Sequence, residues 1–366
     1  MIEPKKNIKP LERVVPNCMD RIGQIVRLER NERTIPFSAS HLKKILSSIN
    51  PEEIVAYPNL EPFYEKLSKW LKVDREELLL TSGSDTGIRA VYEVYVKEGD
   101  EVLMFPPTYG MYSVYCDMFG GVRREVFYNE DFSLPLDKVL NAINSKTKLV
   151  AIANPNHTAT VLKEPELIRI IKKARDSQAL VFVDEAYFNF YEKTVVPRIN
   201  EFDNLIVIRT FSKAFGIASL RIGYLVANKN IIKQLYKVKL THEITGISAR
   251  FGEYLLDHLD IMESYVQDVR AGIKYLSKEF EKLGIATPKT HTNFLFAKLP
   301  LGVDGKQIVS LLKERRFCIA GPFSITPIEG FIRVTVGPVK QMRGFISAFK
   351  LVYEQARKGR LNGEHA

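Results

Sequence analysis

The sequence predicts an α/β protein, with a large domain on a mostly parallel central sheet flanked by helices and a small α+β domain. Two observations carry this prediction. Short apolar runs, typical of strands buried on both faces of a parallel sheet, alternate with helical segments between residues 78 and 208. A long helical pattern over residues 252–283 then leads into alternating strands and helices. We therefore expect an arm at residues 1–43, which packs with the small domain or a dimer partner, the large domain at 44–250 and the small domain at 251–366.

The individual elements follow from the positions of apolar residues, prolines and glycines. Prolines interrupt the arm, and helices are expected at residues 41–49 and 62–71, the first ending before Pro51. In the large domain, strands are predicted at residues 78–82, 101–105, 122–126, 149–153, 180–183 and 205–208, and helices at 88–96, 136–143 and 164–177. In the small domain, strands are predicted at residues 293–299, 317–320 and 331–336, and helices at 305–315 and 340–357.

Bulk composition narrows the class of protein. The 366 residues are 45% hydrophobic and 26% charged, values of an ordinary globular protein rather than a disordered or collagen-like chain. The N-terminus has no apolar stretch typical of a signal peptide, and no apolar run is long enough to span a bilayer. We expect a cytoplasmic enzyme without a membrane partner.

The distribution of charge and the spacing of histidines argue against a nucleic-acid-binding protein and against a metalloprotein. The net charge of +10 is spread along the chain, and no nucleic-acid-binding motif accompanies it, so no nucleic acid partner is expected. The six histidines lack metal-ligand spacing, which predicts no metal site. Cys18, Cys116 and Cys318 are far apart and are expected to be reduced.

A lysine between hydroxyl residues, directly after a predicted strand, is the strongest candidate for chemistry. Thr210, Ser212 and Lys213 follow the strand at 205–208, and Arg221 comes eight residues after the lysine. The carboxyl ends of parallel strands are where ligands bind in open α/β sheets. Hydroxyl, amine and guanidinium groups so close together suit a phosphate with a reactive carbonyl nearby. The alternative is a surface lysine in a Ser/Thr turn.

Other strand ends add candidates that also have structural interpretations. Asp184 and Tyr187 follow the strand at 180–183, where Asp184 either faces the same crevice or caps the next helix. Gly83, Ser84 and Asp85 open a helix whose N–H groups can bind an anion, although any strand-to-helix turn can use such residues. Tyr109 is either a ring platform or a core residue. Arg333 lies among apolar neighbours and needs an anionic partner.

Together these motifs resemble the fold type I pyridoxal-phosphate enzymes, and within them the histidinol-phosphate aminotransferase branch of the class I/II aminotransferases. The similarity runs from about Arg27 to Gly337. It is carried by residues 27–32, Tyr57-Pro58, and residues 106–112, 183–187, 209–215 and 333–337.

The resemblance implies pyridoxal 5'-phosphate as cofactor and a role for each candidate. Lys213 would join the cofactor aldehyde and later shuttle a proton, Asp184 would pair with the ring nitrogen, and Tyr187 would hydrogen-bond the phenolate oxygen. Tyr109 would stack on the ring. The phosphate would be held by Gly83, Ser84, Thr210, Ser212 and Arg221, with Asp85 orienting the turn, and Tyr57 would reach the phosphate or substrate of a neighbouring subunit in a homodimer with shared active sites. Arg333 and Asn31 would bind the substrate.

Two positions depart from the family pattern. His157 stands where the family has an asparagine that donates to the phenolate oxygen; an imidazole N–H can make the same bond, and a charged ring would stabilise the phenolate further. Ala320 stands where histidinol-phosphate enzymes typically have a second substrate-binding arginine. Its absence argues against histidinol phosphate itself, because a charged hydrogen bond contributes about 1.5 to 3 kcal/mol.

Three functions are compatible with these residues. The first is amino transfer between a donor such as glutamate and a small phosphorylated keto or aldehyde acceptor. The second keeps the cofactor but decarboxylates an O-phospho-amino acid, such as phosphoserine or phosphothreonine. The third is a catalytically silent binding protein on the same fold, which the intact lysine, aspartate and arginine set argues against.

Overall fold

The structure is a computed structural model that describes residues 2–11 and 23–361, so that the predicted reduced thiol of Cys18 lies outside the described residues. Its main sheet has seven strands in the order β2-β8-β7-β6-β5-β3-β4. Their bounds are β2 Leu78–Ser82, β3 Glu101–Met104, β4 Val122–Glu125, β5 Thr147–Ala153, β6 Leu180–Asp184, β7 Leu205–Thr210 and β8 Ile222–Ala227. All neighbours are parallel except β8, which runs antiparallel to β2 and β7. The predicted mostly parallel sheet is confirmed, and β8 is a strand that the sequence analysis does not predict.

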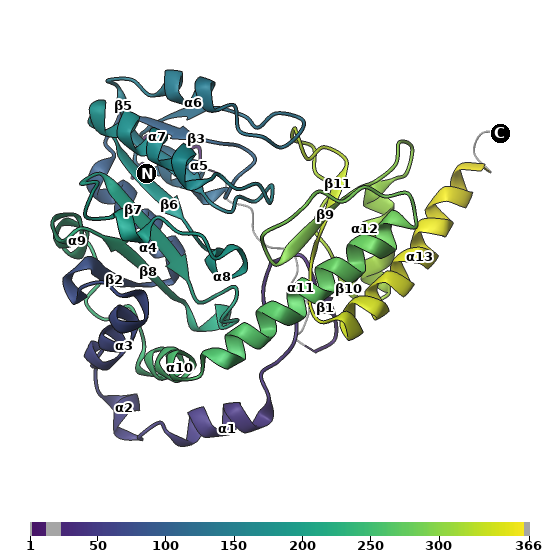
Figure 1. Cartoon of the computed structure of the whole chain (residues 1–366), viewed down its shortest axis with the longest axis horizontal. Helices are drawn as coiled ribbons and strands as arrows, with labels where there is room; N and C mark the ends of the chain where they lie inside the picture. Colours follow the sequence, from purple (N-terminus) through teal and green to yellow (C-terminus); the bar gives the residue numbers. More distant parts are fainter. Residues whose placement is uncertain (1, 12–22, 362–366) are drawn as a thin grey trace.

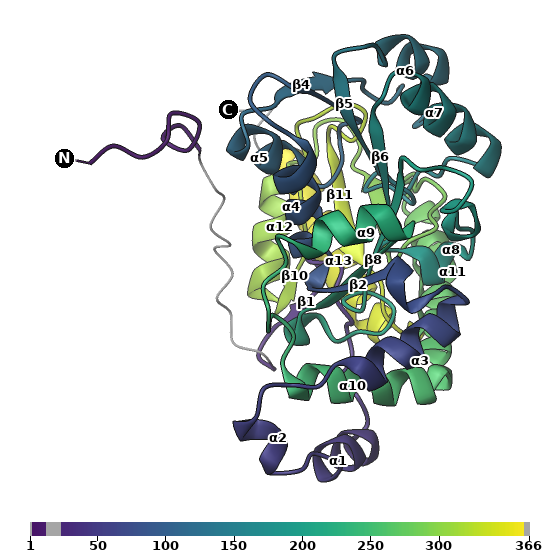
Figure 2. The same cartoon turned by 90° about the vertical axis from the view of Figure 1, so that its left-hand side faces the viewer.

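Helices cover both faces of this sheet (Figures 1 and 2). Successive strand residues point to opposite faces, so that Phe182 and Ile206 pack in one cluster while Val181 and Val207 pack in the other. The first cluster includes residues of α4 (Gly83–Tyr95), α5 (Met111–Met118) and α9 (Lys229–Tyr236); the second includes residues of α3 (Glu61–Leu71), α6 (Leu136–Ala142) and α7 (Glu164–Asp176). This double burial explains why the central strands are continuous apolar runs.

The C-terminal part forms a second, smaller layer beside the main sheet (Figure 1). Strands β9 (Phe294–Lys298) and β11 (Phe331–Thr335) pair antiparallel, and β10 (Phe317–Cys318) pairs with β1 (Val26–Arg27). Helices α11 (Leu259–Glu281), α12 (Gly305–Glu314) and α13 (Val339–Leu361) pack around these strands. The chain segment just after β1 is fastened to the same layer, because Leu28 N–H donates to the Cys318 carbonyl and the Leu28 carbonyl accepts from Thr335 N–H.

The long helical prediction over residues 252–283 is wrong in one respect. The structure has two helices there, α10 (Gly246–Asp257) and α11, separated at His258, whose φ of −131° and ψ of 59° lie outside the helical region. Both helices present apolar residues to one core, for example Leu255 and Met262, so the hydrophobic periodicity continues across the break. The remaining short elements are α1 (Ala39–Ser47), α2 (Glu52–Val55), α8 (Phe188–Tyr191) and 3₁₀ turns at Arg75–Glu77, Val196–Arg198 and Ala218–Leu220.

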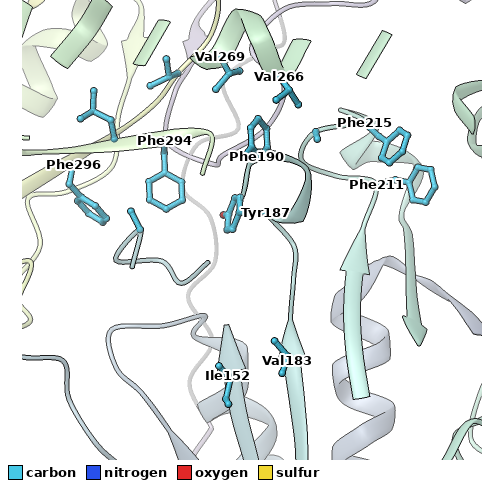
Figure 3. Packing of buried hydrophobic residues seen from close by; sticks show 14 of the residues in the cluster. Ile152, Val183, Tyr187, Phe190, Phe211, Phe215, Val266, Val269, Phe294 and Phe296 are labelled. Atoms are coloured by element: carbon cyan, nitrogen blue, oxygen red, sulfur yellow. The ribbon is translucent and has the colours of Figure 1, made fainter. Parts of the chain in front are cut away.

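A continuous apolar core joins the main sheet to the C-terminal layer. Figure 3 shows Val183 from β6, Tyr187 just beyond it, and Phe294 from β9 in this core, with Val266 and Val269 of α11 nearby. The Tyr187 and Phe294 rings meet edge to face, with centroids 5.5 Å apart. Tyr187 therefore lies where the two parts of the molecule meet. Among the described residues, no helix is both long and apolar enough to cross a bilayer, and no cluster of side chains has the composition of a metal site.

Candidate active site

A cavity of about 940 Å³ opens at the carboxyl ends of the parallel strands, between the main sheet and the C-terminal layer. Most of the candidate residues from the sequence line it: Asn31, Ser84, Asp85, Tyr109, His157, Asp184, Tyr187, Thr210, Ser212, Lys213, Arg221 and Arg333. Gly83 lies directly behind Arg221. Tyr57 does not line the cavity of its own chain; its side chain is 80% exposed and stacks on His242. The volume suits a small-molecule site.

Asp184 is the last residue of β6, and its buried carboxylate is held from two sides. The Tyr112 hydroxyl donates to Oδ2 at 2.7 Å, and the Ala186 N–H donates to Oδ1 at 3.0 Å. Burial raises the pKa of Asp184 to about 6, while Tyr112, Ala186 and the Lys213 charge oppose this rise. A cationic group placed beside the carboxylate would lower this pKa and keep it ionised. The position suits a protonated ring nitrogen.

Lys213 follows β7 by three residues, and its amine points into the same cavity. Its Nζ donates to the Arg30 carbonyl at 3.4 Å and lies 5.8 Å from the centroid of the Tyr187 ring. Burial, with the positive charge of Arg333, lowers the pKa of Lys213 to about 8. The neutral amine, which is the form that attacks an aldehyde, is therefore more populated near neutral pH than in an ordinary lysine.

Tyr187 is positioned by a residue from the far end of the sequence. Asn31 Nδ2 donates to the Tyr187 hydroxyl at 2.9 Å, which leaves the hydroxyl proton free to be donated elsewhere. Asn31 has a φ of 57° and is itself held by Thr335 and Asn293, through its N–H and its carbonyl. Burial raises the pKa of Tyr187 to about 12, so the phenol is protonated. Tyr187 can thus act as a hydrogen-bond donor in the cavity.

A cluster of hydrogen-bond donors lies where α4 begins and β8 begins. Ser82 and Ile222 are partners in the antiparallel β2–β8 pairing, so Gly83 and Arg221 meet at one edge of the sheet. A Cβ on Gly83, which has a φ of +77°, would overlap the Arg221 guanidinium. Thr210 Oγ1 and Ser212 Oγ, 2.9 Å apart, lie at the adjacent end of β7. Helix N–H groups, two hydroxyls and a guanidinium are the donors that a phosphate needs.

Asp85, Tyr109 and His157 occupy the remaining wall. The Asp85 carboxylate accepts from the Tyr109 hydroxyl at 3.2 Å and from the Tyr115 hydroxyl at 3.0 Å, so it orients the tyrosines. The His157 ring lies edge-on to Tyr109, with centroids 5.8 Å apart. Burial, with Arg333 and Lys213 nearby, lowers the pKa of His157 to about 3. A pKa this low favours a neutral ring over the charged imidazole considered above; a neutral ring carries a single N–H, and the ring also makes a backbone hydrogen bond at Thr108.

Three residues of the site are not singled out by the sequence analysis. Tyr112, one helical turn after Tyr109, binds Asp184; Glu29 accepts from Arg333 through its carbonyl at 2.9 Å; and Arg30 accepts from Lys213. Tyr112 and Arg30 fall inside the quoted stretches 106–112 and 27–32, but no spacing rule connects them to their partners. Long-range contacts of this kind depend on the tertiary fold.

Comparison with known proteins agrees with this geometry. The family of class I and II aminotransferases matches residues 26–349, and the chain belongs to this family. Membership makes it a pyridoxal-phosphate-dependent aminotransferase by class, as the sequence analysis predicts.

Particular relatives narrow the branch. The chain is 34% identical over 322 residues to the histidinol-phosphate aminotransferase of Caldanaerobacter subterraneus subsp. tengcongensis, covering 85% of this chain and 88% of that protein. It is 33% identical to the histidinol-phosphate aminotransferase of Thermoanaerobacter sp., covering 88% of this chain and 92% of that one. The crystal structure of histidinol-phosphate aminotransferase from Sinorhizobium meliloti in complex with pyridoxal-5'-phosphate superposes with a TM-score of 0.86 at 21% identity, covering 97% and 98% of the two chains. The predicted fold and branch are confirmed.

Proposed function

We propose that this protein transfers an amino group between an amino acid donor such as glutamate and a small phosphorylated keto or aldehyde acceptor. The observation that carries the proposal is the convergence of the Lys213 amine, the Asp184 carboxylate and the Tyr187 hydroxyl on one cavity. The relatives named above as histidinol-phosphate aminotransferases support a phosphorylated substrate.

The donor set fits pyridoxal phosphate, which supplies when bound an aldehyde and an electron-withdrawing ring that stabilises negative charge at the substrate Cα. Asp184 would hold the ring nitrogen protonated, and Tyr187 and His157 would donate toward the phenolate oxygen. The Gly83–Ser84 turn, Thr210, Ser212 and Arg221 would bind the phosphate. Tyr109 would stack on the ring.

The chain's own groups then account for binding and proton movement. Arg333, whose Nε is buried without a hydrogen-bond partner in the described part of the chain, would bind the substrate carboxylate, beside Asn31. The Lys213 amine, whose pKa is lowered to about 8, would take the proton from the substrate Cα and deliver it to the product. Closure of the cavity between the two layers would keep water from the reacting atoms.

The experiment separates amino transfer from loss of carbon dioxide. The purified protein with pyridoxal phosphate is mixed with glutamate, histidinol phosphate, phosphoserine or phosphothreonine, each with a 2-oxo acid that accepts the amino group, and keto product and carbon dioxide are assayed side by side. Keto product without carbon dioxide supports the proposal, and carbon dioxide release would replace it with the decarboxylase alternative. Lys213→Ala is the control, since it should abolish both turnover and the visible absorbance of bound cofactor. Retained colour and activity would refute the assignment of Lys213.

We also propose that the protein is a homodimer with shared sites, and that residues 44–250 and 251–366 are separate domains. Exposed apolar side chains near Tyr57, namely Leu42 and Leu46 of α1 and Ile54 and Val55 of α2, support a covering partner. Mixing two inactive variants, Tyr57→Ala and Lys213→Ala, tests the sharing. A hybrid dimer has one site with both residues intact, so activity should return on subunit exchange. Recovery of no activity, with exchange verified, would contradict a shared site.

A further inference from the structure

The segment Glu29–Asn31 lines the cavity, and its three residues each hydrogen-bond to a different residue of the site. The Glu29 carbonyl accepts from Arg333, the Arg30 carbonyl accepts from Lys213, and the Asn31 side chain donates to Tyr187. Arg30 is one of the residues that line the same cavity, and its side chain is 33% exposed. The backbone of Arg30 is thus in direct contact with the Lys213 amine.

The terminal nitrogens of Arg30 are uncommitted. Its Nε lies 3.4 Å from Glu29 Oε1, and in residues 2–11 and 23–361 neither terminal nitrogen makes a hydrogen bond or closer ion pair. Arg27 differs, because its Nη2 lies 3.0 Å from the Glu32 carboxylate. Arg33 also differs, since its guanidinium packs over the Phe37 and Tyr265 rings. Arg30 thus keeps the two-pronged edge with which arginine binds carboxylate or phosphate.

The local charge favours an anion at this place. Arg27, Arg30 and Arg333 stand against Glu29 and Glu32 around this side of the cavity, which leaves an excess of positive charge. Ala320 is paired with Arg333 through the backbone, since the N–H of each residue donates to the carbonyl of the other. Ala320 therefore offers no cationic side chain beside Arg333, whereas Arg30 is a second arginine among the residues that line the cavity.

We propose that Arg30 binds the second anionic group, carboxylate or phosphate, of substrates whose first carboxylate or phosphate is held by Arg333. Arg30 is then a specificity-determining residue that selects amino acids with two anionic groups over those with one. The inference rests on the proposed function, because it assigns a substrate class to the same site. The inference goes beyond the proposed function because it names a side chain of the N-terminal segment, that of Arg30, as the residue that determines substrate specificity.

The test compares single-turnover reactions of the holoenzyme with glutamate and phosphoserine, which carry a second anion, and with alanine, which does not. Arg30→Gln should lower the second-order rate constants for the first two by about tenfold or more, as loss of a charged hydrogen bond implies, and leave alanine within about twofold. Arg30→Lys should recover part of the loss. Arg169→Gln, which removes an exposed arginine of α7 that does not line the cavity, is the matched control and should change nothing.

A binding measurement keeps the inference separate from the activity. Calorimetric titration with glutarate and with butyrate should show that Arg30→Gln weakens glutarate by about tenfold and leaves butyrate unaffected. If no amino acid reacts with the wild type while glutarate still depends on Arg30, the proposed function fails and Arg30 remains an anion-binding residue. Equal losses for glutamate and alanine, or unchanged glutarate affinity, would overturn the assignment of Arg30.

Discussion

The Tyr112 hydroxyl donates a 2.7 Å hydrogen bond to the Asp184 carboxylate, and both side chains are buried between β6 and α5. Burial, with a smaller contribution from the Glu185 charge, raises the pKa of Asp184, and Tyr112 is the largest of the opposing influences. The tyrosine therefore helps Asp184 remain negative at the pH where the cofactor nitrogen must be positive.

Tyr112→Phe is expected to raise the pKa of Asp184 above its present value of about 6, because a donor to the charged form is lost. An acid of raised pKa loses its charge as the pH falls through that value. Cofactor affinity should therefore drop about tenfold near pH 6 and much less near pH 8, as measured by absorbance titration. Tyr92→Phe is the control, since the Tyr92 hydroxyl is buried with no hydrogen-bond partner in the described structure. Identical pH dependence in the Tyr112 variant and wild type would contradict the role.

Asp184→Asn removes the charge while keeping the size of the side chain. We expect turnover to fall by about 10³-fold or more, roughly 4 kcal/mol of transition-state stabilisation, because the neutral amide cannot hold the ring nitrogen protonated. Steady-state kinetics at saturating cofactor give the measurement. Unchanged kinetics would remove Asp184 from the cofactor site.

Gly83→Ala should disturb the anion site through Arg221. The added Cβ would overlap the Arg221 guanidinium, so the arginine must move away from the start of α4. We expect cofactor affinity to fall by about tenfold or more, from the loss of a charge-assisted hydrogen bond. Gly99→Ala is the matched control, because Gly99 also has a positive φ, +87°, but nothing lies within 4 Å of its added Cβ. Equal affinity in the two variants would show that Arg221 does not hold the phosphate.

Arg209→Met should lower the stability of the fold without removing a group that acts in catalysis. Arg209 pairs with Glu185 at 2.8 Å, both are buried, and Glu185 also accepts from Thr194 and the Val195 N–H. Removing the arginine leaves a buried carboxylate uncompensated, so the free energy of unfolding should fall by about 3 to 5 kcal/mol in chemical denaturation. The double variant with Glu185→Gln should lose less. A loss equal to or larger than that of the single variant would argue against this ion pair.

The large sheet was accessible to sequence reasoning because each of its central strands is buried on both faces and therefore reads as an apolar run. Asp184 and Lys213 could be located for the same reason, as polar residues at the ends of such runs. Strand β8 is less clear in the sequence, because Arg221 immediately precedes it and Gly223 is its second residue. Its pairing with both β2 and β7 depends on the tertiary fold.

Other features depend on contacts between distant parts of the chain. Asn31 and Tyr187 are 156 residues apart, and the neutral state of His157 results from burial beside Arg333 and Lys213 rather than from local sequence. The break at His258 escaped prediction because no proline or glycine marks it and the apolar face continues through it.

The attachment of Leu28 to both Cys318 and Thr335 has a mechanical consequence. Because these bonds tie the Glu29–Asn31 segment to the C-terminal layer, a hinge-like swing of that layer would carry the segment with it. The same displacement would break the hydrogen bond from Lys213 to the Arg30 carbonyl and the hydrogen bond from Asn31 to Tyr187. Both contacts would then be present in the closed form and absent in the open form. Movement of the C-terminal layer would thus control the site through a segment near the beginning of the chain.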